Sequence, residues 1–236
     1  MNPTIETLHN HRSYRSYKDN PVEAEKLDLI IKAAQSAPSW IHGQQVSIIA
    51  IKDEQRKKEL ARLCGNQKHI EEAPLFLVFC ADFYRASLAG EIEGKTLEAL
   101  NDVDSLLVGA TDVGLGMGYA IAAAESVGLG TVPIGGVRRN SLEVVEFLQL
   151  PKHVIPISGL CVGYGAEDPG QKPRLPVEAV LHEETYKQDQ KAILEQYNKI
   201  MPAPWTQRVA SFYEKSYYAN IAKMLKQQGF SCDDLN

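Results

Sequence analysis

Helix-like and strand-like patterns of apolar residues alternate along the chain. The clearest helical face repeats at the i, i+3, i+4, i+7 spacing and consists of Leu27, Ile30, Ile31 and Ala34. Its helix is expected to open at Asn20-Pro21 and to end before Pro38. Shorter helices are expected after the capping residues Asn2 and Asp53, and over residues 141–148.

Four short segments are apolar at nearly every position, which is typical of strands buried in a sheet. They span residues 46–51, 75–81, 131–134 and 157–162. The first is expected to be covered on both faces, and the second to be buried as well. Interspersed helices and strands favour an α/β or α+β sandwich with helices on both sides of the sheet.

Residues 103–127 are apolar on most sides and rich in glycine and alanine. A helix without a polar face is expected to be buried all round, and a subunit interface is a natural place for it. The stretch Gly114 to Gly118 superficially resembles a dinucleotide-binding loop, but it lies inside this helical pattern, where glycines serve close packing. A last helix is expected over residues 205–228.

Composition restricts the class of protein. With 236 residues, 44% of them apolar, and a net charge of −5, the chain is expected to form one domain, residues 1–236, around a sizeable core. The acidic balance and the lack of a basic stripe argue against binding to nucleic acid. The longest unbroken apolar run, Leu75 to Ala81, is too short to span a membrane, so no membrane helix is expected.

The cysteines and the N-terminal residues indicate the compartment. The first residues lack the basic start and apolar stretch of a signal peptide. The four cysteines lie far apart in the sequence, without metal-ligand spacing, so neither a disulfide framework nor a metal site is expected. We therefore expect reduced, mostly buried thiols in a cytoplasmic protein.

Two cationic segments suggest a ligand that carries a phosphate. The first holds His11, Arg12 and Arg15, with Ser13 between the arginines, which can point the same way from a turn or helix end. The second is Gln171-Lys172-Pro173-Arg174-Leu175-Pro176, which its prolines hold extended. Arginine's planar fork and lysine's point charge both suit phosphate oxygens. Solvated surface charge is the alternative interpretation.

A pair of glycines, Gly135 and Gly136, directly follows a predicted strand. Glycines there let the backbone approach a flat ligand, although an ordinary turn also explains them. The sequence offers no nucleophile elbow, no Walker loop, no paired metal-binding histidines and no convincing pair of acid/base carboxylates. A phosphate-binding protein without such groups either only binds its ligand or takes its chemistry from an organic cofactor.

Several segments, in order along the chain, resemble the signatures of the FMN-dependent nitroreductase family. The likeness covers about residues 2–186 and is closest to the oxygen-insensitive nitroreductase and flavin reductase branch. The matching segments are His11-Arg12-Ser13-x-Arg15-Ser16-Tyr17, Ser36-Ala37-Pro38-Ser39 with Gly43-Gln44-Gln45, Gly65-Asn66-Gln67-Lys68, Ala123 to Gly130, Ile134-Gly135-Gly136-Val137-Arg138 and Lys172-Pro173-Arg174-Leu175-Pro176.

This resemblance implies an α+β fold, a three-layer sandwich with a central mixed sheet flanked by helices. It also implies an intertwined homodimer with two FMN sites at the subunit interface, on which the C-terminal helix would pack. The subunit interface would bury the long apolar helix.

The resemblance also assigns roles to particular residues. Arg12, Lys172 and Arg174 would hold the FMN phosphate with help from His11, and Ser13 would contact the ribityl chain. Arg15 would lie near the pyrimidine end of the flavin and stabilise its reduced, anionic form. The ring system would be contacted by Ser39, Gln67 and the backbone of Ile134, Gly135 and Gly136, near the N5 atom.

The implied activity is a ping-pong transfer of two electrons. NAD(P)H would give hydride to N5 of FMN, and nitroaromatics, quinones or free flavin would then take the electrons, so no side chain is expected to act as the catalytic group. Three alternatives stay open: a non-catalytic flavin-binding or storage protein, a phosphometabolite-binding module without flavin, and a specialised reductase of the same fold such as a dehalogenase.

Two positions depart from the family pattern. Trp40 stands where relatives commonly carry a small hydroxyl residue. With Ile41 and His42 it would border the acceptor pocket and make it bulkier, or it would anchor the dimer seam. The segment from Gln196 to Trp205 looks shortened where the branch carries a basic loop for the 2′-phosphate of NADPH. We therefore expect weak discrimination between NADPH and NADH.

Overall fold

The computed structural model describes residues 2–232 and 234, and these form two compact units. The larger unit contains the described residues up to Pro169 together with those from Asn220 onward. The smaller unit spans Gly170–Ala219. Whether the two units together form the single domain that was expected over residues 1–236 stays a prediction.

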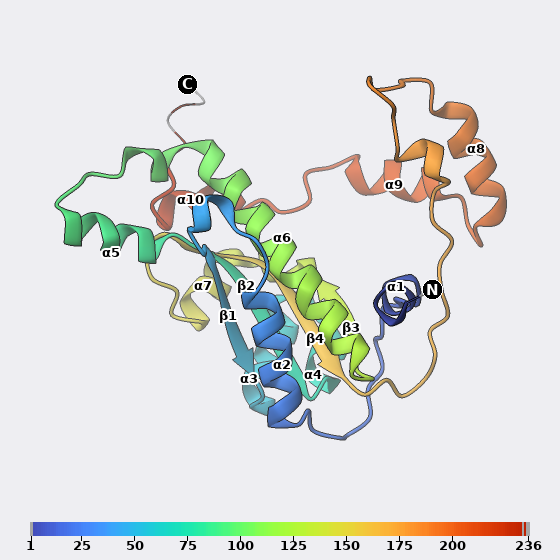
Figure 1. Cartoon of the computed structure of the whole chain (residues 1–236), viewed down its shortest axis with the longest axis horizontal. Coiled ribbons are helices and arrows are strands. Elements are labelled where there is room, and N and C mark those ends of the chain that lie inside the picture. The colour runs from blue at the N-terminus through green and yellow to red at the C-terminus, as the bar shows by residue number, and fades with distance from the viewer. Residues whose placement is uncertain (1, 233, 235–236) are drawn as a thin grey trace. The chain divides into compact units, whose positions relative to one another are not determined.

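The larger unit is built on an antiparallel sheet with the strand order β1-β2-β4-β3 (Figure 1). Its strands are β1 (Val46–Ile51), β2 (Leu75–Asp82), β3 (Gly130–Ile134) and β4 (Val154–Gly163). All four predicted strands are confirmed. The sheet was expected to be mixed, but its described strands all pair antiparallel, and parallel pairing is seen at an isolated bridge between Ser13 and Thr131.

Strand β2 separates two hydrophobic cores. Leu75, Leu77 and Phe79 point into one core, and the alternate residues Phe76 and Val78 point into the other. These five side chains are all fully buried. Strand β1, in contrast, lies at the edge of the sheet, and most of its residues are only half-buried. Val46 and Ile48 nevertheless pack against the first core, and Ile49 and Ile51 pack in the second. Residues 46–51 are therefore covered on both faces, as predicted, although less completely than β2.

Helices cover both faces of the sheet and complete three layers (Figure 1). One core is closed by residues of α2 (Ala24–Gln35), α6 (Val103–Ser126) and α10 (Ile221–Gln227). The other core is closed by residues of α3 (Glu54–Leu63), α4 (Lys68–Glu72) and α7 (Ser141–Phe147). The predicted α+β sandwich is confirmed.

Local capping explains where several helices begin. Helix α1 (Pro3–His9) follows Asn2, whose side chain accepts the N–H of Ile5 at 3.0 Å. Asp53 caps α3 in the same way by accepting the N–H of Arg56 at 2.8 Å. Helix α2, expected from Asn20-Pro21, begins only at Ala24, because the chain first pairs with residues 164–166, just beyond β4, and buries Val22.

Helix α6 is confirmed almost at its expected bounds, but its own chain does not bury it all round. Leu107, Leu115 and Tyr119 are exposed by 63%, 38% and 46%. Its inner face packs in the core, where Gly109 lies against Ala81 and Phe83. By length and composition this helix could span a membrane, yet its packing against the sheet is typical of the core helix of a globular protein.

The smaller unit contains α8 (Lys191–Ile200) and α9 (Trp205–Tyr213), which pack together. Tyr197 is buried against the edge of Trp205, with 6.1 Å between ring centroids. Asn198 Oδ1 accepts the N–H of Thr206 at 3.1 Å, which satisfies one backbone donor in the first turn of α9. The segment from Gln196 to Trp205 is thus mostly the end of a helix, and only residues 201–204 connect α8 to α9.

The helix expected over residues 205–228 is two helices, α9 and α10, with a non-helical connection over residues 214–220. The two helices belong to different units: α9 packs on α8, whereas Met224 of α10 is buried in the core of the larger unit. Their separate packing explains the break. The packing of a C-terminal helix on a dimer stays a prediction.

Helices α4 and α8 were not predicted, and neither were the remaining elements. They are α5 (Tyr84–Glu93) and the short 3-10 helices η1 (Trp40–His42), η2 (Glu98–Asn101), η3 (Gly135–Arg138) and η4 (Val177–Ala179).

Candidate functional site

The first cationic segment is extended beside the sheet. Tyr14 donates its N–H to Thr131 O at 2.9 Å, and Lys18 donates its N–H to Tyr164 O at 2.8 Å. In extended chain, residues three apart lie on opposite sides. Arg12 and Arg15 were expected to point the same way from a turn or helix end, and instead they have different neighbours.

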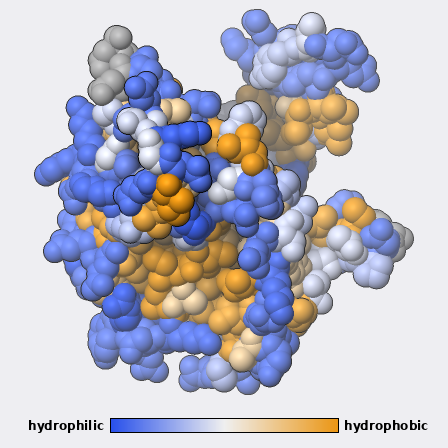
Figure 2. Space-filling model, turned by 60° about the vertical axis from the view of Figure 1, so that its left-hand side comes forward, coloured by the Kyte–Doolittle hydropathy of each residue, from blue (hydrophilic) through white to orange (hydrophobic). Residues whose placement is uncertain are grey.

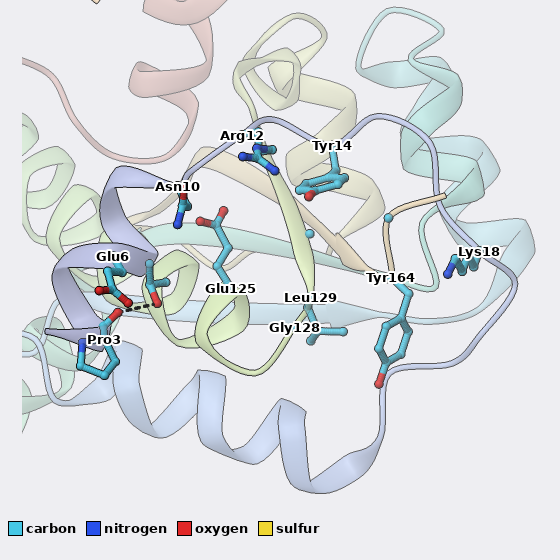
Figure 3. A pocket seen from close by; sticks show the side chains of 13 residues that line it. Pro3, Glu6, Asn10, Arg12, Tyr14, Lys18, Glu125, Gly128, Leu129 and Tyr164 are labelled. Atoms are coloured by element: carbon cyan, nitrogen blue, oxygen red, sulfur yellow. Dashed lines mark hydrogen bonds between the residues drawn. The ribbon is translucent and has the colours of Figure 1, made fainter. Parts of the chain in front are cut away.

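Arg12 lies beside a cavity of about 680 Å³ (Figure 3). Its Nη1 atom donates to Asp168 Oδ2 at 3.1 Å. Its Nε atom is buried and has no hydrogen-bond partner among the described residues. Buried guanidinium nitrogens are normally satisfied, so this N–H is available to an acceptor that enters the site.

His11 is held by a carboxylate from the end of α6. Glu125 Oε1 lies 2.7 Å from His11 Nδ1 and accepts the hydroxyl of Thr131 at the same distance. An ionised carboxylate only accepts hydrogen bonds, so the Nδ1 position of His11 carries a proton. Glu125 rises from the helix end toward Asn10 and Arg12 in Figure 3. The helix, the sheet and the cationic segment are therefore joined at one point.

Arg15 lies near Ser13 and His69, and not at the cavity beside Arg12. Its guanidinium donates to Ser13 O at 3.4 Å. Burial lowers the pKa of His69 below its ordinary value, and the positive charge of Arg15 lowers it further. His69 Nε2 is also buried without a hydrogen-bond partner among the residues that the structure describes. The positive charge of Arg15 therefore lies close to α4, and it disfavours the charged form of His69.

The lowered pKa of His69 predicts a pH dependence of stability. Because the unfolded chain binds a proton more readily than the folded one, His69 contributes stability above about pH 6.5 that is lost as the pH falls further. The free energy of unfolding from urea titrations at pH 7.5 and 5.5 should therefore fall less in H69Q than in the parent.

The half-buried His182 supplies a second His-to-Gln variant for comparison, and the fall in stability should be reduced more in H69Q than in H182Q. Part of the dependence should survive in H69Q, because burial also lowers the pKa of His153. An equal fall in H69Q and in the parent contradicts the assignment to His69.

Gly136 and Gln67 are brought together at the end of β3. A Cβ on Gly136 would lie 2.2 Å from Gln67 Nε2 and 2.5 Å from Cys64 O. Gln67 Nε2 donates to the same carbonyl at 2.9 Å. Gly135, one residue earlier, is more open, because its Cβ would meet Arg138 Nη2 only at 3.4 Å. The predicted turn after the strand is confirmed, and Gly136 is required there by close packing.

Ser39, Trp40, Ile41 and His42 belong to a separate loop at the other edge of the sheet. Ser39 Oγ accepts the N–H of Gln44 at 3.1 Å. Trp40 is 61% exposed and Ile41 is 80% exposed. Whether these residues border an acceptor pocket or anchor a dimer seam stays a prediction.

Lys172 and Arg174 lie in the smaller unit, where both are exposed. Tyr197 donates its hydroxyl to Pro173 O at 2.8 Å and so ties their segment to α8. The segment has no helix or strand, in agreement with the extended conformation that its prolines predict. The meeting of Lys172 and Arg174 with Arg12 around one phosphate stays a prediction.

Three of the four cysteines are poorly suited to act as nucleophiles. Cys64, Cys80 and Cys161 are buried and free, as the sequence predicted. Burial raises the pKa of the Cys64 and Cys80 thiols to about 12, which leaves almost no reactive thiolate at neutral pH. In the described part of the chain no three potential metal ligands lie together, and the absence of a metal stays a prediction.

Sequence reasoning missed four polar residues that organise the site. Glu125 holds His11, Asp168 pairs with Arg12, Asp112 accepts the N–H of Trp40, and Arg85 binds the carbonyls of Gln44 and Val46. Glu125 lies inside one of the matching segments, and this was the only signal for any of them.

Two family models and several named relatives match this chain. The Nitroreductase family model matches residues 8–164, and the model described as "Nitroreductase family, C-terminal domain" matches residues 172–233. The chain is 50% identical to a Bacillus subtilis protein named FMN reductase [NAD(P)H], over 99% of this chain and 100% of the relative. It is 40% identical to an oxygen-insensitive NADPH nitroreductase of Salmonella typhimurium, over 95% and 92%.

Solved structures agree as well. A structure of B. megaterium NfrA2 superposes with a TM-score of 0.95 at 48% identity, covering 98% of each chain. Together with the two matching family models, this similarity settles the family: the chain belongs to the nitroreductase family.

Proposed function

We propose that this protein is an FMN-dependent oxidoreductase that passes electrons from NAD(P)H to nitroaromatics, quinones or free flavin. The observation that carries the proposal is 50% identity, over nearly the whole chain, to a relative named FMN reductase [NAD(P)H]. We also propose a cytoplasmic location, which the free, buried thiols of Cys64, Cys80 and Cys161 support.

The residues at the phosphate end fit FMN. Arg12 carries a buried Nε–H without a partner, and its Nη1 is occupied by a carboxylate, which is itself an oxyanion. His11 has its Nδ1 atom turned to Glu125, which leaves Nε2 to face another group. The arginine guanidinium is a suitable donor for phosphate oxygens.

The residues proposed for the two ends of the flavin also have a suitable spacing. Arg12 and Arg15 are three residues apart in an extended segment, which corresponds to about 10 Å of chain. Arg15 lies near His69, which belongs to the short helix α4. Gln67 directly precedes α4 and lies against Gly136. One end of the segment therefore suits the phosphate, and the other suits the ring system.

Lys172 and Arg174 are proposed to complete the phosphate site. Asp168, which pairs with Arg12, precedes Lys172 by four residues. Lys172 and Arg174 therefore follow the partner of Arg12 closely in the sequence. Ser13 is proposed for the ribityl chain, and Ser39, together with the backbone of Ile134, Gly135 and Gly136, for the ring system.

In this mechanism the side chains position and stabilise, and they do not form bonds to substrate. When bound, FMN would supply the redox chemistry, a two-electron transfer between NAD(P)H and the acceptor. Arg12, with Lys172 and Arg174, neutralises the phosphate. Arg15 provides fixed positive charge where negative charge develops. Gly136 admits the backbone close to the ring, and a flat face is left for each substrate in turn.

We further propose a homodimer, supported by apolar surface that the single chain leaves uncovered. Helices α1 and α6 line a groove of about 830 Å³, with Leu8, Leu115 and Tyr119 exposed by 50%, 38% and 46%. Figure 2 shows a broad hydrophobic area ringed by hydrophilic residues. Apolar patches of this kind are typical of subunit interfaces.

We expect the protein to discriminate only weakly between NADPH and NADH. Only residues 201–204 connect α8 to α9, and Lys199 and Arg208 are the cations closest to them in the sequence. Few cations are therefore available for the 2′-phosphate of NADPH. We expect the kcat/KM ratio of NADPH to NADH to stay below about 10³, which corresponds to about 4 kcal/mol. A larger ratio in steady-state assays contradicts this expectation.

Turnover tests the proposed function against the alternatives. The purified protein should oxidise NAD(P)H continuously when p-benzoquinone, a nitroaromatic or free FMN is present. A flavin-storage protein would hold FMN but show no turnover with any acceptor, and a phosphometabolite-binding module would hold no flavin at all. Turnover confined to one zwitterionic substrate would indicate a specialised reductase.

A further inference from the structure

Asp112 is a buried acidic residue in the middle of the apolar helix α6. It is 2% exposed, and its Oδ1 atom accepts the backbone N–H of Trp40 at 3.1 Å. Its Oδ2 atom is buried and has no hydrogen-bond partner in the part of the chain that the structure describes. A buried carboxylate oxygen without a donor is unfavourable, so a residue with this environment is expected to serve a purpose other than stability.

The loop that Asp112 contacts has an unusual backbone. Ile41, His42 and Gln44 all have left-handed φ angles, of 47°, 58° and 51°. A β-branched residue such as Ile41 rarely adopts this conformation, and such strain persists only where the surroundings hold it.

The same loop is held at its far end by a second charged group. Arg85 Nη2 donates to Gln44 O at 2.5 Å and to Val46 O at 2.9 Å. Its Nη1 donates to Asp82 Oδ2 at 2.8 Å, which fixes the guanidinium. Asp112 at Trp40 and Arg85 at Gln44 therefore clamp the two ends of the loop.

The clamped loop presents apolar side chains outward. Trp40 and Ile41 are among the most exposed large apolar side chains of the larger unit, although the backbone beneath them is held. Asp112, Ser39, Gln44 and Arg85 line a cavity of about 570 Å³ below the loop. A rigid backbone with an exposed indole gives a flat apolar surface of fixed orientation, which suits a flat molecule.

We infer that Asp112 is a positioning residue for the acceptor: through the N–H of Trp40 it fixes the loop of residues 39–44 and so determines which flat acceptors bind. This inference rests on the proposed function, in which Trp40, Ile41 and His42 border the acceptor pocket. Asp112 itself touches no substrate.

Two substitutions separate the hydrogen bond from the charge. Asn at position 112 keeps a side-chain oxygen that can accept the N–H of Trp40, whereas Ala removes it. D112N should therefore behave like the parent protein, and D112A should free the loop. D104N is the matched control, because Asp104 is exposed in the first turn of the same helix.

Both loop order and kinetics are measured in a W205F parent, in which Trp40 is the only tryptophan. In D112A the fast component of the Trp40 anisotropy decay should rise at least about twofold, as expected for a side chain on a mobile loop. The KM for p-benzoquinone and for 4-nitrobenzoate should rise about tenfold. The KM for NAD(P)H and the FMN content should stay within about twofold, and D112N and D104N should match the parent.

Three results would contradict either the role inferred for Asp112 or the proposed function on which it rests. Each result can be told apart from the other two. A lower melting temperature in D112A with unchanged Trp40 anisotropy and unchanged acceptor KM shows a purely structural role. Equal losses in D112A and D112N show that the charge matters rather than the hydrogen bond. If the parent shows no turnover with any acceptor, the proposed function fails, and the Trp40 anisotropy still decides whether Asp112 positions the loop.

Discussion

Replacing Arg12 by alanine is expected to weaken FMN binding about 100-fold, or by about 2.7 kcal/mol. The substitution removes the buried Nε–H that has no partner among the described residues, and it removes the fork that pairs with Asp168. Lysine restores only a point charge, so R12K should recover part of the affinity. The dissociation constant is measured by titrating flavin-free protein with FMN and following flavin fluorescence.

Arg62 provides the matched control for this titration. It is an exposed arginine of α3 that already forms two hydrogen bonds to Glu59, at 2.9 and 2.6 Å. R62A should leave the dissociation constant within about twofold, because exposed ion pairs contribute little. A similar loss of affinity in R12A and R62A would show a general effect of net charge and would count against a phosphate site at Arg12.

Replacing Gly136 by alanine is expected to destabilise the protein by about 2 to 3 kcal/mol and to abolish flavin binding. The new Cβ would lie 2.2 Å from Gln67 Nε2 and 2.5 Å from Cys64 O. The side chain of Gln67 can move, but the carbonyl of Cys64 belongs to the backbone after α3 and cannot move without shifting the turn. Urea unfolding followed by circular dichroism measures the loss.

A substitution at the neighbouring Gly135 distinguishes an effect on the free energy of unfolding from an effect on FMN binding. A Cβ on Gly135 would meet only the end of the Arg138 side chain, at 3.4 Å. G135A should therefore leave the free energy of unfolding within about 0.5 kcal/mol. If the backbone at Gly135 lies against the flavin ring, G135A should still weaken FMN binding. Equal destabilisation by both substitutions contradicts the packing described for Gly136.

Local signals in the sequence predicted most of the larger unit. Asn2 and Asp53 cap helices through bonds to residues three positions along the chain, so both starts could be predicted. The unbroken apolar run of β2 requires cover on both faces, and two cores provide it.

Features that depend on distant parts of the chain were not predictable. Strand β1 is as apolar as β2, and only the strand order places it at the edge. The apolar stripe over residues 205–228 continues through the break at 214–220, because α9 and α10 pack on different units.

The candidate site shows the same division. The segments that carry His11, Gln67 and Gly136 could be found by their resemblance to the family, because each is a short pattern. Glu125 lies 114 residues from its partner His11, and Asp112 lies 72 residues from its partner Trp40. An isolated acidic residue in an apolar helix gives no indication of such a partner until the fold is known.

The visible spectrum of the purified protein under anaerobic conditions tests the central claim most directly. The account predicts a bound flavin whose absorbance band bleaches on addition of one equivalent of NADH or NADPH and returns when p-benzoquinone is added. A colourless protein that does not take up FMN, or a flavin band that neither nucleotide bleaches, would contradict it.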